Sequence, residues 1–177
     1  MKRIGFFGGC FNPPNNVHIK IANKLIKENK LDEVVFIPVN DYYDKEKLVE
    51  AKHRYNMLKL SIQGYDNLKV DDIEIKENRK LYAVDAFIVI RNSSYATKCL
   101  KRDIFMIMGS DNFNKMPKWK DYDIIKDEYN YIVIERNKND ISSTKIREMI
   151  KLKNNEVKKY LHEDVYKYII ENNLYSE

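Results

Sequence analysis

The stretch from Ile4 to His18 reads IGFFGGCFNPPNNVH and carries the residue types of a phosphate-binding loop. Gly8 and Gly9 follow a short apolar run, and a turn-prone Asn-Pro-Pro-Asn segment separates them from an amphipathic pattern that begins near Val17. Glycine lets a ligand approach the backbone closely, and the start of a helix offers free N–H groups at the positive end of its dipole. His18 falls on the first turn of that expected helix, where its imidazole would face the same place. The sequence therefore predicts an anion site.

A second group of hydroxyl and basic residues stands at residues 141–147, which read ISSTKIR. Serine and threonine at a helix start satisfy its free N–H groups, and capping alone is the simpler interpretation of this segment. Arg147 lies about one turn further on, where its guanidinium could reach an anion held at the same helix start. Because the chain already contains the loop at residues 8–18, we interpret the segment as a second phosphate clamp. Its members are Ser142, Ser143, Thr144 and Arg147.

Apolar runs and amphipathic stretches alternate along the chain in the manner of a parallel α/β sheet. The expected strands are residues 3–7, 33–38, 68–70, 103–109 and 131–134. The expected helices are residues 17–29, 47–63, 82–92, 119–126, 143–152 and 164–172. Short strands separated by helices long enough for crossovers predict a Rossmann-like fold with a doubly wound, mostly parallel sheet. We expect residues 1–177 to form a single domain that ends in C-terminal helices.

In such sheets, ligands bind beyond the carboxyl ends of the strands, where the strand order reverses. Three loops with chemically informative residues fall at strand ends in the expected order of elements. They are residues 8–18, 39–45 and 109–112. We therefore expect these loops to line one site.

Charge and composition narrow the classes of partner. The net charge is +5 at pH 7, but lysines are interleaved with acidic residues, as at residues 45–47, and form no basic stripe with aromatic residues. A nucleic-acid partner is therefore not expected. A membrane is not expected either, since no apolar run near membrane-spanning length and no signal peptide is visible. Cys10 and Cys99 are expected to be free thiols in a reducing cytoplasm. His53 and His162 have no partner at metal-ligand spacing, so no protein-held metal is expected.

Taken in order, these segments resemble the motifs of HxGH-type nucleotidyltransferases, specifically the bacterial nicotinate-nucleotide (nicotinic acid mononucleotide) adenylyltransferase family. Residues 8–13 resemble that family's opening GG-[ST]-F-[DN]-P, and residues 141–147 its closing ISSTxIR. Residues 53–58 resemble the segment after its second strand, and residues 109–112 its G-[AS]-D-x turn. Trp119 stands where its substrate-stacking tryptophan is expected. The likeness covers essentially the whole chain at compatible spacing.

The resemblance implies adenylyl transfer, in which the phosphate of nicotinate mononucleotide attacks the α-phosphorus of ATP and releases pyrophosphate, as in NAD biosynthesis. Because the attacking phosphate is already anionic, the protein would act mainly by alignment and by neutralising developing charge. Mg²⁺ would be bound mainly through ATP oxygens and water. Small-molecule nucleotides are the expected partners, and the sequence leaves a homo-oligomer open.

The resemblance also implies roles for individual residues. His18, Asn15 and Arg147 would be catalytic, with His18 on the α/β-phosphates and Arg147 at the β/γ end. Asp111 would accept from a ribose hydroxyl, although a Gly-Ser-Asp-Asn turn also explains it. Trp119 would stack on a pyridine, or is an ordinary tryptophan. The expected ATP-binding residues are Gly8, Gly9, Cys10, Phe11, Asn15, His18, Gly109, Asp111, Ser142, Ser143, Thr144 and Arg147. The expected acceptor-binding residues are Val39, Asn40, Lys45, Arg54, Ala83 and Trp119.

The chain departs from the family pattern at several of these positions. Asn15 replaces the first histidine of H-x-G-H and Val17 its glycine, and asparagine can donate to phosphate but carries no charge. Residues 39–45 keep only the lysine of the usual loop, and Ala83 and Ala86 stand in place of two hydroxyl residues. Three interpretations stay open: the family's own activity, a related adenylyl- or cytidylyltransferase with another phosphorylated acceptor, and a nucleotide-binding sensor with weakened catalysis.

Overall fold

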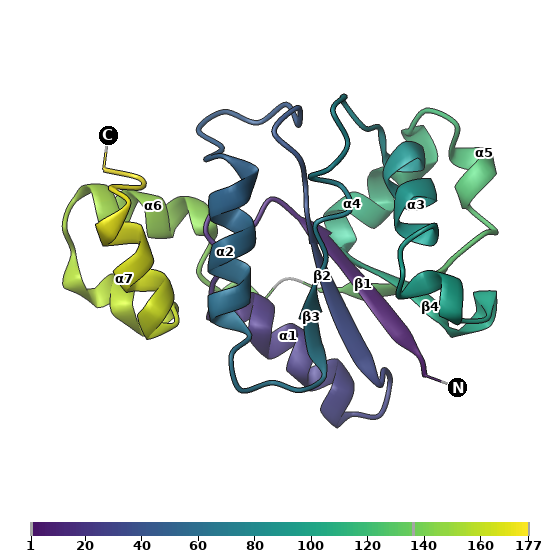
Figure 1. Cartoon of the computed structure of the whole chain (residues 1–177), viewed down its shortest axis with the longest axis horizontal. Coiled ribbons are helices and arrows are strands. Elements are labelled where there is room, and N and C mark those ends of the chain that lie inside the picture. The colour runs from purple at the N-terminus through teal and green to yellow at the C-terminus, as the bar shows by residue number, and fades with distance from the viewer. Residues whose placement is uncertain (1, 136, 177) are drawn as a thin grey trace.

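A parallel five-stranded sheet forms the centre of the protein in this computed structural model, which describes residues 2–135 and 137–176 (Figure 1). Its strands are β1 (Ile4–Gly9), β2 (Glu33–Pro38), β3 (Leu68–Val70), β4 (Ile104–Gly109) and β5 (Asn130–Ile134). The strand order is β3-β2-β1-β4-β5, and every neighbouring pair is parallel. The chain moves outward from β1 to β3 and then crosses to β4 on the other side of β1. The strand order therefore reverses between β1 and β4, where a ligand site is expected.

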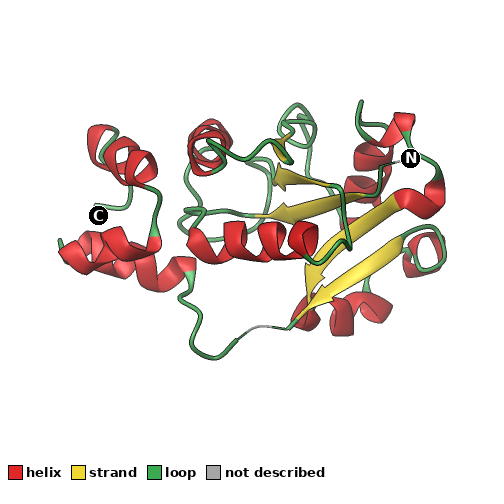
Figure 2. Ribbon diagram, turned by 90° about the horizontal axis from the view of Figure 1, so that it is seen from below, coloured by secondary structure: helices red, strands yellow, loops and turns green. Residues whose placement is uncertain are grey.

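Helices connect the strands and cover both faces of the sheet (Figure 2). The α-helices are α1 (Asn16–Lys27), α2 (Ala51–Ser61), α3 (Ala83–Arg91), α4 (Ser110–Lys115), α5 (Tyr122–Ile125), α6 (Ser143–Lys151) and α7 (Glu163–Glu171). Short 3₁₀ turns are η1 (Ala96–Lys98), η2 (Lys101–Asp103), η3 (Met116–Lys118) and η4 (Asn155–Tyr160). Because helices cover both faces, β2 is buried along its whole length, and its sequence EVVFIP is accordingly a nearly continuous apolar run.

Two apolar clusters divide the core between the faces of the sheet. On one face, Ile19, Ala22 and Leu25 of α1 pack with Leu58 of α2 against β2. On the other face, the buried residues of α3 recur at every third position, as Val84, Phe87 and Ile90, and belong to the same cluster as Phe6 and Ile37. These buried stripes hold the helices, and with them the loops that follow each strand, in place.

The C-terminal helices α6 and α7 lie beside α2, away from the sheet (Figure 1). Met57 of α2 joins an apolar cluster with α6, η4 and α7. The Tyr168 hydroxyl of α7 lies 2.9 Å from His53 Nδ1 and 3.1 Å from Asn56 Nδ2, which donates to it. The end of the chain is therefore docked on α2. Within the described residues, no helix is long and apolar enough to cross a membrane.

The predicted fold class is confirmed, and the five expected strands lie within three residues of the observed ones. Two expected helices were wrong in extent. The helix expected from residue 47 begins at Ala51, because Lys47 has a left-handed backbone (φ +57°) that no α-helix continues. The helix expected over residues 119–126 is shortened to α5, which begins at Tyr122 because Asp121 also has φ +57°. The single turn α4 was expected as a loop.

Candidate active site

A cleft of about 1310 Å³ opens at the carboxyl ends of β1, β2 and β4, where the strand order reverses. The expected site residues all line it, with the exception of Arg54. Those from the expected ATP set are Gly8, Gly9, Cys10, Phe11, Asn15, His18, Gly109, Asp111, Ser142, Ser143, Thr144 and Arg147. Those from the expected acceptor set are Val39, Asn40, Lys45, Ala83 and Trp119.

Asn15 and His18 together cap the start of α1. Asn15 Oδ1 accepts from the N–H groups of Val17 at 3.0 Å and His18 at 3.4 Å, and His18 Nδ1 accepts from the Asn15 N–H at 3.0 Å. This is a reciprocal capping box, in which the side chain at the third helical position satisfies the backbone of the cap. With Nδ1 accepting, a neutral imidazole carries its proton on Nε2, so His18 can act as a hydrogen-bond donor without being charged.

Both predicted phosphate segments meet at one corner of the cleft, although they lie more than a hundred residues apart. Ser143 Oγ donates to Pro13 O at 2.8 Å, and Asn15 Nδ2 donates to Ser143 Oγ at 3.4 Å. Arg147 Nη1 donates to Asn12 O at 2.8 Å. The starts of α1 and α6 are thus joined into one unit, which we call the phosphate corner; it comprises Asn12, Pro13, Asn15, His18, Ser142, Ser143, Thr144 and Arg147. Two adjacent helix starts direct their dipoles and N–H groups to one place.

Within the second segment, Ser142 caps the helix, whereas Arg147 is held beside the helix start. Ser142 Oγ accepts from the Lys145 N–H at 3.1 Å, so Ser142 is the N-cap of α6, as the simpler interpretation expected. Arg147 Nη2 donates to Thr144 Oγ1 at 3.3 Å. The guanidinium is thereby held beside the helix start, at the edge of the cleft.

Space around two glycines indicates where a ligand would lie. A Cβ built on Gly8 or on Gly109 would meet no atom within 4 Å, although both residues line the cleft. Packing within the protein therefore does not require glycine at these positions, whereas close approach of a ligand to the backbone does. Gly9 differs, because its Cβ would lie 3.0 Å from the ring of Phe11.

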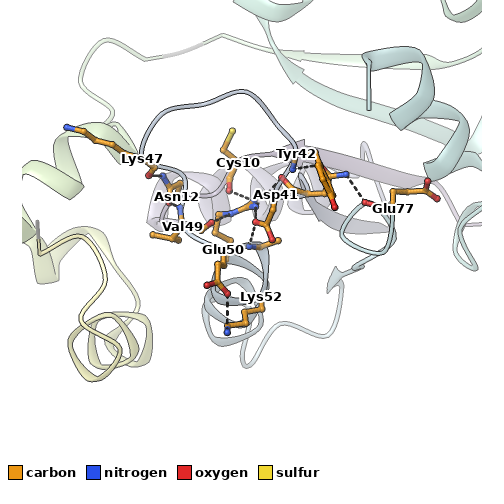
Figure 3. A network of polar contacts seen from close by, with 12 residues as sticks. Cys10, Asn12, Asp41, Tyr42, Lys47, Val49, Glu50, Lys52 and Glu77 are labelled. Atoms are coloured by element: carbon orange, nitrogen blue, oxygen red, sulfur yellow. Dashed lines mark hydrogen bonds and ion pairs between the residues drawn. The ribbon is translucent and has the colours of Figure 1, made fainter. Parts of the chain in front are cut away.

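The structure corrects the expectation for Arg54, whose side chain is fully buried behind the cleft wall. Its guanidinium donates to Val49 O at 2.7 Å, Cys10 O at 3.1 Å and Asn40 O at 3.4 Å. The network that joins Cys10, Asp41 and Val49 is drawn in Figure 3. Arg54 therefore supports the loops after β1 and β2 instead of presenting its charge to a ligand.

Asn40 also has a structural use for its side chain, which is 3% exposed. Its Nδ2 donates to Glu77 O at 3.1 Å and Arg79 O at 2.8 Å, while its Oδ1 accepts from the Tyr42 N–H at 3.1 Å. The Val39 N–H donates to Gly9 O at 3.1 Å. Several backbone donors of the 39–45 loop are thus already engaged, which reduces the number left to bind an acceptor carboxylate.

The acceptor side of the cleft has an aromatic wall and a basic rim. Trp119 packs partly on the core cluster that includes Phe87, and it also faces the cleft. Tyr82 is half exposed, and the ammonium groups of Lys80 and Lys120 lie 5.7 and 5.3 Å from its ring centre. The lysines that line this side are Lys45, Lys80, Lys115, Lys118 and Lys120. Sequence reasoning missed this rim because it treated scattered lysines as solvated surface; their clustering around Trp119 was the available signal.

Glu74 is another residue of the cleft that sequence reasoning missed. It lines the cleft, as Tyr43 does, and is only 5% exposed. Burial raises the pKa of this carboxyl to about 7, against the opposing effect of Arg54. No local sequence pattern marks it, since burial of a lone glutamate depends on what packs over it.

Glu74 makes the stability of the protein depend on pH. Its pKa is raised in the folded state from 4.5 to about 7, so the native protein binds more protons than the unfolded chain in this window, and stability falls as pH rises through it. We expect wild type to lose about 2 to 3 kcal/mol more than Glu74→Gln between pH 5 and pH 8. Urea unfolding of both proteins at both pH values measures this difference, and equal pH dependence of the two would contradict it.

Fold and site together define a Rossmann-like α/β protein with a nucleotide-type cleft at its switch point. Residues 6–149 match the cytidylyltransferase-like family. The chain belongs to this family of nucleotidyltransferases, as a relative of the nicotinate-nucleotide adenylyltransferases. The predicted family is thereby confirmed.

Two relatives match along nearly their whole length. The chain is 31% identical over 194 residues to the nicotinate-nucleotide adenylyltransferase of Bacillus subtilis (strain 168), with 99% of both covered. It is 30% identical over 194 residues to the probable nicotinate-nucleotide adenylyltransferase of Lactococcus lactis subsp. lactis (strain IL1403), covering 99% of this chain and 96% of the relative. A solved structure of Plasmodium falciparum nicotinic acid mononucleotide adenylyltransferase complexed with NaAD has a TM-score of 0.76 at 22% identity, covering 99% of this chain and 98% of that one, which shows a common fold.

Proposed function

We propose that this protein transfers AMP from ATP to nicotinate mononucleotide and releases pyrophosphate, as a cytoplasmic enzyme of NAD biosynthesis formed by residues 1–177 as one nucleotidyltransferase domain. The observation that carries the proposal is the phosphate corner, in which the starts of α1 and α6 are joined beside two glycines with open space above them. Full-length similarity to nicotinate-nucleotide adenylyltransferases supports the choice of substrates.

ATP would lie with its triphosphate in the phosphate corner. The positive dipole ends of the two helices and the guanidinium of Arg147 suit phosphate oxygens. The hydroxyl and guanidinium groups of the α6 start suit an anion, so Mg²⁺ would be bound through ATP oxygens and water. When bound, the ion neutralises part of the phosphate charge. Gly109 and Asp111, which line the cleft after β4, would meet the nucleoside.

In the reaction, an oxygen of the acceptor phosphate forms a bond to the α-phosphorus of ATP while the bond to the β-phosphate oxygen breaks. His18 would donate from Nε2 to an α-phosphate oxygen, and Arg147 would stabilise the charge that gathers on the leaving pyrophosphate. A protein nucleophile is not needed, because the acceptor supplies the attacking oxygen. The protein's task is therefore to align two anions and to compensate their charge.

A second candidate function is transfer to a different phosphorylated acceptor. It is favoured by the wall formed by Ala83 and Ala86, which line the cleft without hydroxyl groups to donate hydrogen bonds. A screen for pyrophosphate release across phosphorylated acceptors tests both candidates. Turnover with nicotinate mononucleotide supports the first, and turnover only with another acceptor supports the second. ATP binding without turnover of any acceptor would favour a sensor.

For the acceptor, we expect a pyridine mononucleotide to be used best, with only a modest preference for the acid over the amide. A site discriminates strongly when it hydrogen-bonds the distinguishing group, and here the alanines supply no donor while the Val39 N–H is already bonded within the protein. Trp119→Ala should lower kcat/KM for both nucleotides about 10-fold through lost stacking.

The measurement is kcat/KM for nicotinate mononucleotide and nicotinamide mononucleotide on wild type, Trp119→Ala and Trp119→Phe. The phenylalanine variant is the matched control, since it keeps a flat ring at the same position. A wild type that rejects the amide sharply would show that other groups read the carboxylate. Unchanged kinetics in Trp119→Ala would remove this ring from the acceptor site.

A further inference from the structure

The end of the chain reaches the phosphate corner through Tyr175. Its hydroxyl donates to Asn12 Oδ1 at 2.9 Å, a contact between residues 163 positions apart. The tail after α7 turns back toward the corner because Asn173 and Tyr175 have left-handed backbones, with φ values of +51° and +62°. The Leu174 N–H donates to Ile169 O at 3.0 Å and fixes this turn on α7.

Asn12 is a junction for four parts of the chain. The residue is 1% exposed, and its Nδ2 donates to Lys47 O at 2.8 Å. Its Oδ1 accepts from the Val49 N–H at 3.3 Å as well as from Tyr175, and its backbone carbonyl accepts from Arg147. Tyr175 thus bonds to the side chain of Asn12, and Arg147 bonds to the backbone carbonyl of the same residue.

Burial keeps the Tyr175 hydroxyl a donor. It raises the pKa of the phenol above the ordinary value for tyrosine, and this outweighs the opposing effects of the guanidinium groups of Arg147 and Arg54. The phenol is therefore protonated at neutral pH and can donate to Asn12 Oδ1.

We propose that Tyr175 is a positioning residue of the nucleotide site, which acts through Asn12 to hold Arg147 where it meets the β- and γ-phosphates of ATP. This role for Tyr175 rests on one part of the proposed function, namely that the protein binds ATP. Loss of the hydroxyl leaves Asn12 Oδ1 still bonded to Val49 and leaves the apolar contacts of the tail in place. What it removes is one of the three hydrogen bonds of the Asn12 side chain, and with it the restraint that the C-terminal tail places on the loop that carries the Arg147 acceptor.

The chain offers a matched control in Tyr168 of α7. Its hydroxyl also joins the C-terminal region to the rest of the protein, through His53 and Asn56 of α2, but it has no bond to the phosphate corner. Tyr168→Phe and Tyr175→Phe thus delete the same group from the same region. A purely structural effect of C-terminal docking would be common to both variants.

The test is calorimetric binding of ATP and AMP, with Mg²⁺, to wild type, Tyr175→Phe, Tyr168→Phe, Arg147→Ala and the double variant Tyr175→Phe/Arg147→Ala. AMP lacks the phosphates that Arg147 would bind. We expect Tyr175→Phe to weaken the binding of ATP about 3- to 10-fold and the binding of AMP less than about 2-fold. In the Arg147→Ala background, the same change should have almost no further effect on ATP affinity, because the two residues act as one unit.

Equal weakening of ATP and AMP by Tyr175→Phe, additivity with Arg147→Ala, or the same ATP-to-AMP shift in Tyr168→Phe would each overturn the proposal. Failure of wild type to bind ATP would instead reject the proposed nucleotide function, and this proposal with it. The wild-type measurement decides the function, and the variants decide the role of Tyr175. Melting temperatures of all five proteins confirm that each is folded at the temperature of the titration.

Discussion

His18→Ala is expected to lower turnover by roughly 100-fold or more, with a smaller change in KM for ATP. His18 is held on the first turn of α1 by its Nδ1, which accepts from the Asn15 N–H at 3.0 Å, and edge-to-face contacts with Phe7 and Phe11 fix the plane of the ring. With Nδ1 accepting, the proton of a neutral imidazole is on Nε2, the nitrogen that would donate to a phosphate oxygen whose charge changes in the transition state. A donor that is already oriented needs no reorganisation when that charge develops.

Steady-state kinetics of pyrophosphate release measure this effect, with His18→Gln as a variant that keeps an amide donor and should lie between wild type and alanine. Asn15→His provides a comparison at the neighbouring position. Histidine can cap a helix through Nδ1, as His162 does for α7, so this variant should keep the α1 cap and remain active. An active His18→Ala enzyme with wild-type kcat would remove His18 from the chemistry.

Arg147→Ala is expected to weaken ATP binding about 10- to 100-fold. Hydrogen bonds between charged partners contribute about 1.5 to 3 kcal/mol each, and the guanidinium is the cation that the structure places beside the α6 start. Arg147→Lys should recover only part of the affinity. A lysine keeps the charge but has no fork with which to bond Asn12 O and a phosphate at the same time.

Lys145→Ala is the matched control, because it removes a positive charge from the same turn of α6. The Lys145 ammonium pairs with Glu148 at 3.2 Å and is exposed, so ATP affinity should change less than about 2-fold. Calorimetry with Mg²⁺ and ATP on the three variants and wild type decides the matter. Equal affinities of wild type and Arg147→Ala would place the β- and γ-phosphates elsewhere.

The observed contacts explain how the protein can keep the structure of the site although its sequence departs from the family pattern at several positions. Asn15, at the first position of H-x-G-H, caps α1 and bonds to Ser143, so its substitution preserves the local structure. The 39–45 loop keeps Lys45 on the cleft, but its neighbours Val39 and Asn40 are engaged by the protein itself. The ATP side is thus preserved more fully than the acceptor side, and acceptor specificity is the more informative measurement.

Features that depend on neighbours within one strand or one helical turn could be predicted from the sequence. The apolar run at β2 and the hydroxyl cap of α6 were predicted, because each is set by a few adjacent residues. The turn expected at Gly8 and Gly9 was wrong, since both glycines continue β1 and pair with Ile37 and Pro38. The order of strands and helices followed, since short strands joined by crossover helices leave few alternatives to a parallel sheet. Left-handed backbones at Lys47 and Asp121 were missed because neither residue is a glycine that would signal them.

Which of these residues meet, and which are covered, depends on the tertiary structure. Arg54, predicted to bind a ligand, is buried behind the cleft, and Glu74, not predicted, is buried at its wall. The bond from Arg147 to Asn12 and the bond from Tyr175 to Asn12 each join residues more than a hundred positions apart. Burial and such pairings depend on the packing of whole elements against each other, which no local pattern encodes. The residue types that line the cleft were therefore visible in the chain, whereas the contacts that hold them in place required the fold.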